Sequence, residues 1–378
     1  MEESANPGER IRLGLLGAGG FCVFAAQHFA RVPGVQIAGV ADLNPVPALA
    51  IAERFGLGAP DDVAGLIARD DIDLIYISTP PFLHHEQSMA ALRAGKHVIV
   101  EKPTALTLAQ ADEMLALAAR TGRLMVTDLM QRYNPLFDAV AELVRRKPLG
   151  EFLHGYFENY AGDEGLGPEH WFWDRSRSGG IFIEHVVHFF DMFAGWLGEG
   201  EVIAAQRTLR PGSGIEEQTN CTVRYRDGML VNMYNGFTQA NRLDRQETRL
   251  LFERGDLTLD GWIPIRARIR ALANGPGLAE LTALFPHADV KIEPIRPGER
   301  APSRARHKPL AVDRSVEVDE GLGSDKSQRY GEMLRAMLAD QIAWIRNPGH
   351  ERKITEWNGR ASLAMAVRAT VLADLAEA

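Results

Sequence analysis

Cysteine is nearly absent from this chain of 378 residues, which contains only Cys22 and Cys221. Two cysteines so far apart in sequence cannot form a disulfide framework, and their scarcity fits a reducing compartment. Long apolar runs are also missing, because no stretch approaches the roughly 20 residues that a membrane-spanning helix needs. Residues 1–10 are polar and acidic and lack the apolar core of a signal peptide. We therefore expect a soluble, cytoplasmic protein with no membrane partner.

An excess of positive charge is lacking too. The chain has 42 Lys and Arg against 50 Asp and Glu, a formal net charge of −8. Nucleic-acid binding leaves a basic electrostatic footprint, so we predict no nucleic-acid partner. Internal repeats and low-complexity tracts are absent as well. The length allows two domains, each with a sizeable core.

A glycine-rich turn near the N-terminus gives the first positive indication of function. The apolar run Ile11–Leu16 ends at Gly17, Gly19, Gly20 and Phe21, and a helical pattern follows. This is typical of a buried strand, a tight turn and a helix N-terminus, whose free N–H groups and dipole suit a pyrophosphate. The third glycine of the usual fingerprint is replaced by Cys22.

A second strand, Val35–Asp42, supports this interpretation. It ends in Asp42, about 20 residues after the glycines, where a carboxylate accepts both hydroxyls of an adenosine ribose. Leu43, Asn44 and Pro45 follow, with no Arg or Lys placed for a 2′-phosphate. The pattern favours NAD over NADP. The alternative is a structural glycine turn with Asp42 as a loop residue.

Alternating strands and helices continue to about residue 130. Leu74–Ser78, His97–Val100 and Leu124–Asp128 are predicted strands, and helices are predicted over Val46–Phe55, Asp61–Ala68, His84–Ala94 and Leu108–Thr121. Thr107 and Gln110 have capping-box spacing at the start of the last helix. The alternation predicts a doubly wound parallel sheet with ligands at the carboxyl ends of its strands. Thr79-Pro80, Glu101-Lys102-Pro103 and Asp128 fall at such ends.

The pattern changes after residue 150. Strands are predicted over Phe152–Tyr160, Val202–Leu209, Gln218–Tyr225, Met229–Phe237 and Glu247–Phe252, with a helix over Ile181–Leu197 and closing helices over 327–346 and 356–375. The fold class is thus α/β: a Rossmann domain over 1–130 and an α+β domain over 131–378 with a large, open, mostly antiparallel sheet. A dimer or tetramer through that sheet is expected, because its free face needs cover.

The region around residues 265–306 is less regular. Residues 274–306 are interpreted as an irregular insertion, and the basic runs 266–270 and 304–307 as a solvated face or a subunit contact. The roles of 265–306 and of His185 stay open.

Two clusters carry the chemistry. Lys102 ends a buried strand at the predicted cofactor crevice, where an ammonium can polarise a substrate oxygen; the alternative is a surface salt bridge. Glu184, His188 and Asp191 share a stripe at i, i+4 and i+7 on a regular helix. Glu184 would orient His188 and support its positive form, so that His188 acts as the base. A core histidine and a divalent metal site on Glu184 and His188 are the alternatives, and we predict no metal.

The order of these motifs resembles the Gfo/Idh/MocA family, which includes glucose–fructose oxidoreductase and inositol dehydrogenase. The motifs are the glycine turn, Thr79-Pro80-x-x-x-His84, Glu101-Lys102-Pro103 and Gly179-Gly180 followed by Glu184-x-x-x-His188-x-x-Asp191. The resemblance implies that Lys102 is catalytic and that His188 is the acid/base. The family usually has Asp where this chain has Glu184, and often Gly where it has Val186.

The resemblance also guides the choice of binding residues. We expect the cofactor to contact Gly17, Gly19, Gly20, Phe21, Asp42, Thr79, Pro80, His84, Glu101, Lys102 and Arg132. We expect the substrate to contact Lys102, Arg132, Tyr133, Asn134, Trp173, Arg175, Glu184 and His188. Arg175 and Arg132 are equal candidates for the recognition of an acidic group on the substrate. Loop packing is the alternative for the aromatic segment that contains Trp173 and Arg175.

The sequence thus predicts an NAD-dependent oxidoreductase that acts on a secondary hydroxyl or ketone of a sugar, a sugar derivative or a cyclitol. One alternative is a glycoside-cleaving enzyme that keeps NAD bound through a transient redox cycle. The other is a non-catalytic NAD-binding regulator.

Overall fold

The computed structural model describes residues 10–163, 165–296 and 303–377, and the chain divides into two compact units. Unit 1 comprises Met1–Tyr133, Pro168–Asp191 and Tyr330–Val367. Unit 2 comprises Asn134–Gly167, Met192–Arg329 and Arg368–Ala378. The predictions about residues 1–9 lie outside the described residues.

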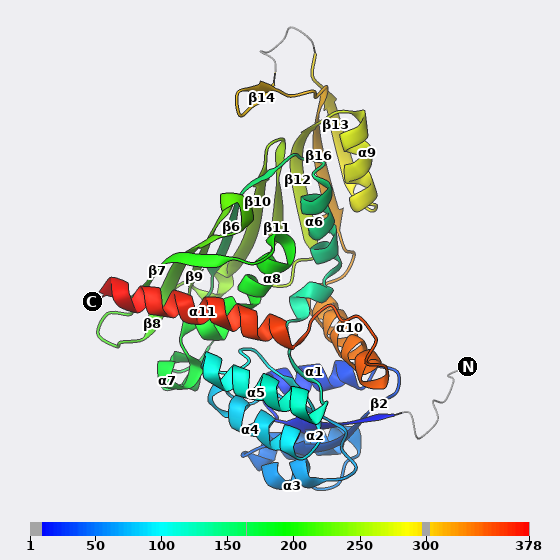
Figure 1. Ribbon diagram of the computed structural model, residues 1–378, viewed down its shortest axis with the longest axis vertical. Coiled ribbons are helices and arrows are strands. Elements are labelled where there is room, and N and C mark those ends of the chain that lie inside the picture. Colours follow the sequence, from blue (N-terminus) through cyan, green and yellow to red (C-terminus); the bar gives the residue numbers. More distant parts are fainter. Residues whose placement is uncertain (1–9, 164, 297–302, 378) are drawn as a thin grey trace. The chain divides into compact units, whose positions relative to one another are not determined.

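Unit 1 is built on a five-stranded parallel sheet with the order β2-β1-β3-β4-β5. Its edge strand β2 is labelled in Figure 1. Its strands are β1 Ile11–Leu16, β2 Val35–Ala41, β3 Leu74–Ile77, β4 His97–Val100 and β5 Met125–Thr127. Every residue of β3 and β4 is buried, as expected for central strands covered on both faces. This is the predicted doubly wound sheet.

Helices connect these strands. They are α1 Gly20–Phe29, α2 Pro45–Phe55, α3 Val63–Ala68, α4 Pro81–Arg93 and α5 Leu108–Thr121, and unit 1 also contains the short α7 Arg175–Ser178. The predicted capping box of α5 is confirmed, because Thr107 accepts from the N–H of Gln110 and Gln110 reaches back to Thr107. α4 begins three residues before the predicted His84, since Pro81 occupies the first helical position, where a missing N–H costs nothing.

Unit 2 contains a nine-stranded sheet with the order β13-β16-β12-β11-β10-β6-β9-β8-β7. The strands are β6 Phe152–Tyr160, β7 Glu201–Leu209, β8 Glu216–Arg224, β9 Leu230–Gly236, β10 Arg245–Phe252, β11 Gly255–Asp260, β12 Arg266–Ala273, β13 Asp289–Pro294 and β16 Arg314–Gly321. The β6–β9 pair is parallel and the other pairs are antiparallel. The mostly antiparallel sheet is therefore confirmed. A separate hairpin joins β14 Arg304–Ala305 to β15 Lys308–Pro309.

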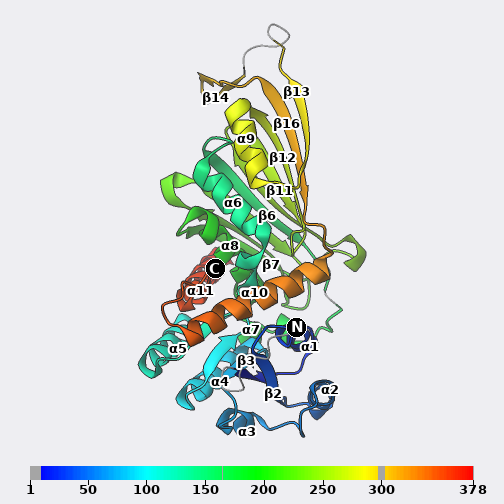
Figure 2. The same ribbon diagram turned by 90° about the vertical axis from the view of Figure 1, so that its right-hand side faces the viewer.

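Helices α6 Pro135–Arg146 and α9 Gly275–Leu284 lie against one face of this sheet (Figure 2). The prediction that 274–306 is an irregular insertion is wrong for its first part, because Gly275–Leu284 forms α9 and Asp289–Pro294 forms the edge strand β13. Residues 297–302 of this stretch lie outside the described residues. Asn274 caps α9 and Pro276 follows in its first turn, so a helix start signal was present.

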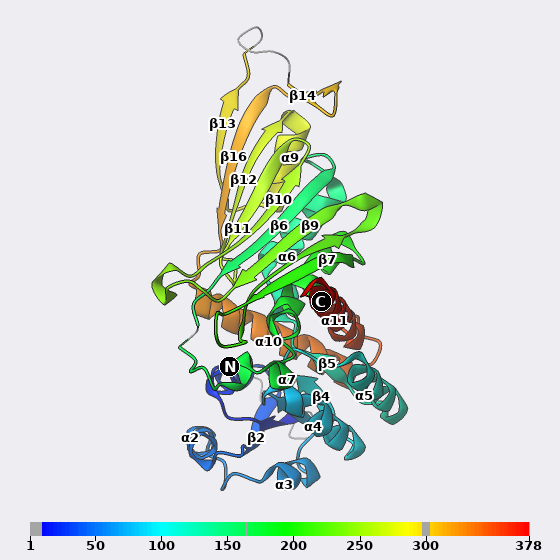
Figure 3. The same ribbon diagram turned by 90° about the vertical axis from the view of Figure 1, so that its left-hand side faces the viewer.

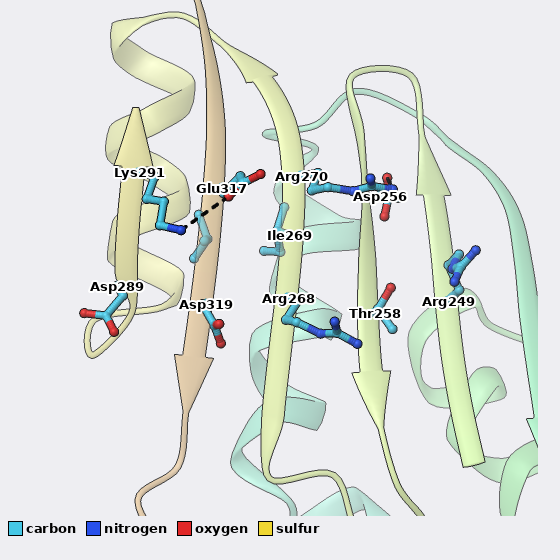
Figure 4. A pocket seen from close by; sticks show the side chains of 11 residues that line it. Arg249, Asp256, Thr258, Arg268, Ile269, Arg270, Asp289, Lys291, Glu317 and Asp319 are labelled. Carbon is cyan, nitrogen blue, oxygen red and sulfur yellow. Dashed lines mark hydrogen bonds and ion pairs between the residues drawn. The ribbon is translucent and has the colours of Figure 1, made fainter. Parts of the chain in front are cut away.

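The strands of the opposite face are seen in Figure 3 without a helix in front of them. Side chains of this face alternate with buried ones: Arg266, Arg268 and Arg270 of β12 are exposed, and Ala267 and Ile269 between them are buried. Figure 4 shows the same face, with Arg268 and Arg270 beside acidic side chains of β11 and β16. The arginines of the basic run 266–270 thus lie on the exposed face of this sheet.

Three long helices complete the chain: α8 Val187–Leu197, α10 Lys326–Arg346 and α11 Glu356–Glu377. The division between the units falls within each of them. The two predicted closing helices are confirmed. Both cysteines are free and buried. Among the described residues, no helix is long and apolar enough to cross a membrane.

Candidate active site

The turn between β1 and α1 forms an open cradle of backbone. Gly17 has φ +102°, and a Cβ there would lie 2.9 Å from the carbonyl of Ser78, so the position requires glycine. Space is open around Gly19 and Gly20. Gly19 caps α1 without a side-chain hydrogen bond, and no acidic residue occupies the first turn. The cradle therefore fits an anion such as a dinucleotide pyrophosphate.

Asp42 follows β2 and connects this turn to the next loop. Its Oδ2 accepts from the N–H of Ala18 at 2.6 Å, and its Oδ1 accepts from the N–H of Asn44 at 2.7 Å. Each carboxylate oxygen retains further lone pairs for a ribose hydroxyl. The next residue, Leu43, is 85% exposed.

Lys102 and Glu184 form an ion pair that joins the end of β4 to the segment before α8. The Lys102 ammonium donates to Glu184 Oε1 and, at 3.0 Å, to the Glu184 main-chain oxygen. The two side chains are 18% and 7% exposed. Glu184 Oε2 is buried and has no hydrogen-bond partner among the described residues. The pair is thus nearly shielded from water, and one carboxylate oxygen is left for a further donor.

The segment that carries Glu184 departs from the regular helix that the spacing predicted. Phe182–Val186 forms one wide π-helical turn before α8 begins at Val187. Such turns carry one extra residue and occur at functional sites. Gly179 and Gly180, both with positive φ, lead into it, and a Cβ on Gly179 would lie 2.7 Å from Ile183. Glu184 therefore lies in the wide turn, and His188 lies in the regular helix after it.

His188 is buried and is held neutral. Burial first, then the Lys102 charge and His185, lower the pKa of His188 well below its usual 6.5. Burial and Lys102 lower the pKa of His185 to about 3. Glu184 was expected to support the positive form of His188. The lowered pKa of His188 does not agree with that expectation, and the Glu184 carboxylate is bonded to Lys102 instead. A neutral imidazole at this place can accept a proton.

Arg132 and Asp191 form a second buried pair one turn further along α8. Arg132 donates to both carboxylate oxygens of Asp191, at 2.7 and 2.8 Å, and to its main-chain oxygen at 3.0 Å. Asn358 donates to the same carboxylate at 3.2 Å. Asp191 is 2% exposed. This two-pronged contact anchors the helix that carries His188.

A cluster of buried acids lies beside Lys102. The Tyr76 hydroxyl donates to Glu101, and burial raises the pKa of Glu101. Burial and the neighbouring Glu101 raise the pKa of Asp128 well above its usual value. Like charges this close disfavour double ionisation, so the two carboxyls retain a proton that an isolated one would lose.

Thr79, Pro80 and His84 surround the start of α4. The two ring nitrogens of His84 lie 2.7 Å from the Pro103 carbonyl and 2.8 Å from the Thr79 carbonyl. Burial lowers the pKa of His84 to about 4. The imidazole thus bridges the loops after β3 and β4. The Thr79 hydroxyl donates to Gln87 at 2.6 Å, Pro80 precedes α4, and the Lys102–Pro103 peptide is cis.

Tyr133 and Asn134 bond to protein atoms. The Tyr133 hydroxyl donates to Asp340 at 2.5 Å. In unit 2, the Asn134 amide donates to the Pro264 carbonyl at 2.8 Å, and its oxygen caps α6 by accepting from Leu136 at 3.0 Å. Both side chains thus have structural contacts.

The aromatic segment before Gly179 lies in unit 1. Trp173 is buried against Phe172, with ring centroids 4.6 Å apart, and Arg175 is exposed at the start of α7. The sequence analysis passed over His170 and Arg177 in this segment. Burial and the Arg177 charge lower the pKa of His170, and the Glu184 charge raises it. His170 and Arg177 could have been predicted from the same aromatic loop, because they lie on either side of the predicted residues Trp173 and Arg175.

Among the described residues, no group of three or more His, Cys, Asp or Glu side chains is arranged to hold a metal ion. The candidate residues of unit 1 are the open backbone cradle after β1 and the side chains of Lys102, Glu184 and His188. A glycine turn of this kind, between the first strand and the first helix of a parallel sheet, is typical of a Rossmann domain that binds a dinucleotide.

Comparison with known proteins supports a dinucleotide-binding Rossmann domain followed by a C-terminal domain of the same family. Residues 11–128 match the family described as "Oxidoreductase family, NAD-binding Rossmann fold", and residues 137–258 match the "GFO/IDH/MocA C-terminal domain". The chain belongs to the Gfo/Idh/MocA family of dehydrogenases and reductases.

Individual relatives are distant. The 1,5-anhydro-D-fructose reductase of Ensifer adhaerens is 29% identical over 239 residues, which cover 60% of this chain and 69% of that protein. A glycosyl hydrolase family 109 protein of Shewanella amazonensis is 32% identical over 157 residues, 38% of this chain and 34% of that one. Among solved structures, the WlbA dehydrogenase of Bordetella pertussis, in complex with NADH and UDP-GlcNAcA, has a TM-score of 0.77 at 17% identity. That match covers 97% of this chain and 96% of the other, and it shows a shared fold.

Proposed function

We propose that the protein is an NAD-dependent oxidoreductase that transfers hydride between the nicotinamide and a secondary hydroxyl or ketone of a sugar, a sugar derivative or a cyclitol. The observation that carries the proposal is the buried Lys102–Glu184 ion pair next to a neutral His188 at the carboxyl edge of the sheet. These are the groups that such a reaction needs: a cation for the oxygen and a base for its proton.

Each residue has a distinct role in this proposal. The nicotinamide supplies the hydride acceptor when it is bound. Lys102 donates a hydrogen bond to the reacting oxygen and stabilises its developing negative charge. Glu184 holds the Lys102 ammonium in place. His188 takes the hydroxyl proton during oxidation and returns it during reduction, so the proton balance is the same in both directions.

NAD is preferred over NADP in this proposal because of Asp42. A carboxylate at this place accepts ribose hydroxyls and repels a 2′-phosphate. The Asp42 carboxylate is held by two backbone N–H groups, and Leu43, Asn44 and Pro45 after it carry no positive charge. Gly17, Gly19, Gly20 and Phe21 would hold the pyrophosphate.

We further propose that residues 1–130 bind the cofactor and that residues 131–378 bind substrate and form a homodimer or homotetramer. The exposed face of the unit 2 sheet supports the second part (Figure 4). It has a hollow of about 480 Å³ lined by both basic and acidic side chains, such as Arg268, Arg270, Asp256 and Glu317. A surface with both signs of charge can pair with a copy of itself across a two-fold axis. Mass determination by light scattering at low and high salt tests this, and a monomer under both conditions would contradict it.

The first experiment is cofactor release. The purified protein is heat-denatured, the supernatant is assayed for NAD(H) and NADP(H), and the stripped protein is titrated with each. Exchangeable binding that prefers NAD is expected. A panel of sugars and polyols is then assayed with NAD, and Lys102→Met and His188→Ala should lose turnover while they keep NAD binding. Wild-type turnover in either variant would contradict the role given to that residue.

A second candidate function has support from the similarity to the glycosyl hydrolase family 109 protein. In this alternative the protein keeps its cofactor and cleaves a glycosidic bond through transient oxidation of the sugar. Near-stoichiometric NAD in the heat-released supernatant, without net reduction during turnover of a glycoside, would favour it over the dehydrogenase.

A further inference from the structure

Arg177 is a cation in unit 1 with no acidic partner bonded to it among the described residues. It is half-buried in the last turn of α7, and its guanidinium carbon lies 4.7 Å from the centroid of the Phe82 ring. Phe82 is in the first turn of α4, directly after the loop that follows β3. Arg177 is therefore held at the carboxyl edge of the sheet, the edge on which Lys102 lies.

The acid nearest in sequence has other partners. Asp174 caps α7, and its Oδ1 accepts from the N–H of Ser176 at 2.9 Å and from the Ser176 hydroxyl at 2.7 Å. The Arg177 charge is the weakest of the influences that lower the pKa of Asp174. The guanidinium thus stacks on an aromatic ring and keeps its N–H donors for another acceptor.

His170 experiences the charges of both Arg177 and Glu184. Burial is the largest cause that lowers the pKa of His170; the Arg177 charge lowers it further, and the Glu184 charge raises it. The Nδ1 of His170 accepts from the N–H of Phe172 at 3.3 Å. The neutral ring therefore carries its proton on Nε2, which is a donor. Arg177 and His170 together offer donors and one positive charge close to Glu184.

The other two candidate arginines are placed differently. Arg132 donates to both carboxylate oxygens of Asp191, so the charge of Arg132 is neutralised inside the protein. Arg175 is exposed at the first position of α7. Arg177 is positioned by the Phe82 ring and has no carboxylate bonded to it among the described residues.

We propose that Arg177 and His170 form a subsite for the carboxylate of a sugar acid, so that the substrate is a uronate or an aldonate. This inference rests on the proposed function, and it names the substrate class of that same site. One guanidinium and one neutral donor match a single negative charge, and the planar guanidinium fork suits a planar carboxylate. A site built to bond a charged group discriminates strongly against an analogue that lacks it.

The test compares matched acid and neutral substrates with NAD, followed by NADH absorbance. The pairs are D-glucuronate with D-glucose, D-galacturonate with D-galactose, and D-gluconate with D-glucitol; D-glucose 6-phosphate is included. The variants are Arg177→Gln and Arg177→Lys. Arg93→Gln is the control, because Arg93 is exposed in the last turn of α4. Thermal unfolding of each variant verifies that it is folded, and NADH affinity is measured by fluorescence titration.

The expected result is preference of the wild type and of Arg93→Gln for the acid in at least one pair. Arg177→Gln should raise KM for that acid by roughly 10- to 100-fold, the usual value of a charged hydrogen bond, and leave the NADH affinity unchanged. Arg177→Lys should recover part of the loss.

Other outcomes overturn the inference. Turnover of neutral sugars alone, or of the sugar phosphate alone, refutes the carboxylate subsite while the proposed function stands. Loss of NADH affinity in Arg177→Gln, with KM unchanged, assigns the guanidinium to the cofactor instead. Absence of turnover with every sugar, acid or neutral, refutes both the inference and the proposed function.

Discussion

Replacement of Lys102 by Met should separate stability from catalysis. In the native protein the Lys102 ammonium neutralises Glu184, whose side chain is 7% exposed and whose Oε2 has no partner among the described residues. Lys102→Met leaves that carboxylate unpaired. Breaking a buried ion pair costs 3–5 kcal/mol, and because Lys102 is 18% exposed we expect the lower end, about 3 kcal/mol. The variant Lys102→Met/Glu184→Gln removes both charges and should regain about 2 kcal/mol of this.

Urea denaturation of the cofactor-free protein measures the free energy of unfolding, and NADH absorbance measures turnover with the substrate found by the panel. Lys102→Met should lose both stability and activity. The double variant should regain stability but remain at least ~100-fold less active, because the cation at the reacting oxygen is still missing. If the single variant is as stable as the wild type, the ion pair does not have the assigned energy. If the double variant regains activity along with stability, Lys102 acts only through the fold.

Three further predictions concern unit 1. Lys102→Met should raise the pKa values of His185 and His188, since the Lys102 charge lowers both; NMR titration of the ring protons measures this, and unchanged values would contradict it. Gly359→Ala should destabilise the protein by about 1–3 kcal/mol, because the new Cβ would overlap the hydroxyls of Thr104 and Thr127, whereas Gly58→Ala, in open space, should have little effect in the same denaturation assay. The pKa of His84 is about 4 in the folded state and 6.5 ordinarily. The unfolded chain therefore binds the proton more tightly, and stability present above pH 6.5 is lost as the pH falls toward 4. The loss is roughly 2 kcal/mol at pH 5, and it should be smaller in His84→Gln.

The sequence predicted unit 1 well because its signals are local. The buried apolar runs of β3 and β4, the capping box at Thr107 and the glycine turn at Gly17 depend on neighbours a few residues away. The stretch 274–306 was harder because Gly275 and Gly277 flank Pro276 in the first turn of α9, a composition that is usual for a loop. Tertiary packing against β12 overrides that propensity.

The wide turn at Phe182–Val186 could not be predicted from spacing. A regular helix places Glu184, His188 and Asp191 on one stripe, which suggested a bond between Glu184 and His188. Glu184 instead binds Lys102, which is 82 residues away in sequence, and Asp191 binds Arg132, which is 59 residues away. Each of these two carboxylates thus binds a cation from the Rossmann domain, Lys102 or Arg132, and the pKa values of His185 and His188 between them are lowered.

The same reasoning decides which side chains remain for a ligand. Sequence motifs predict which side chains can donate hydrogen bonds to a ligand. Such a side chain can bind the ligand only if no acceptor of the folded protein already occupies its donors. Tyr133 and Asn134 meet acceptors that lie 207 and 130 residues away, at Asp340 and at the Pro264 carbonyl. Arg177 meets an aromatic ring instead of a carboxylate. Among the described residues no carboxylate is bonded to this guanidinium, and a single ordered surface charge contributes little to folding. We therefore attribute the placement of Arg177 to a negatively charged group of the substrate.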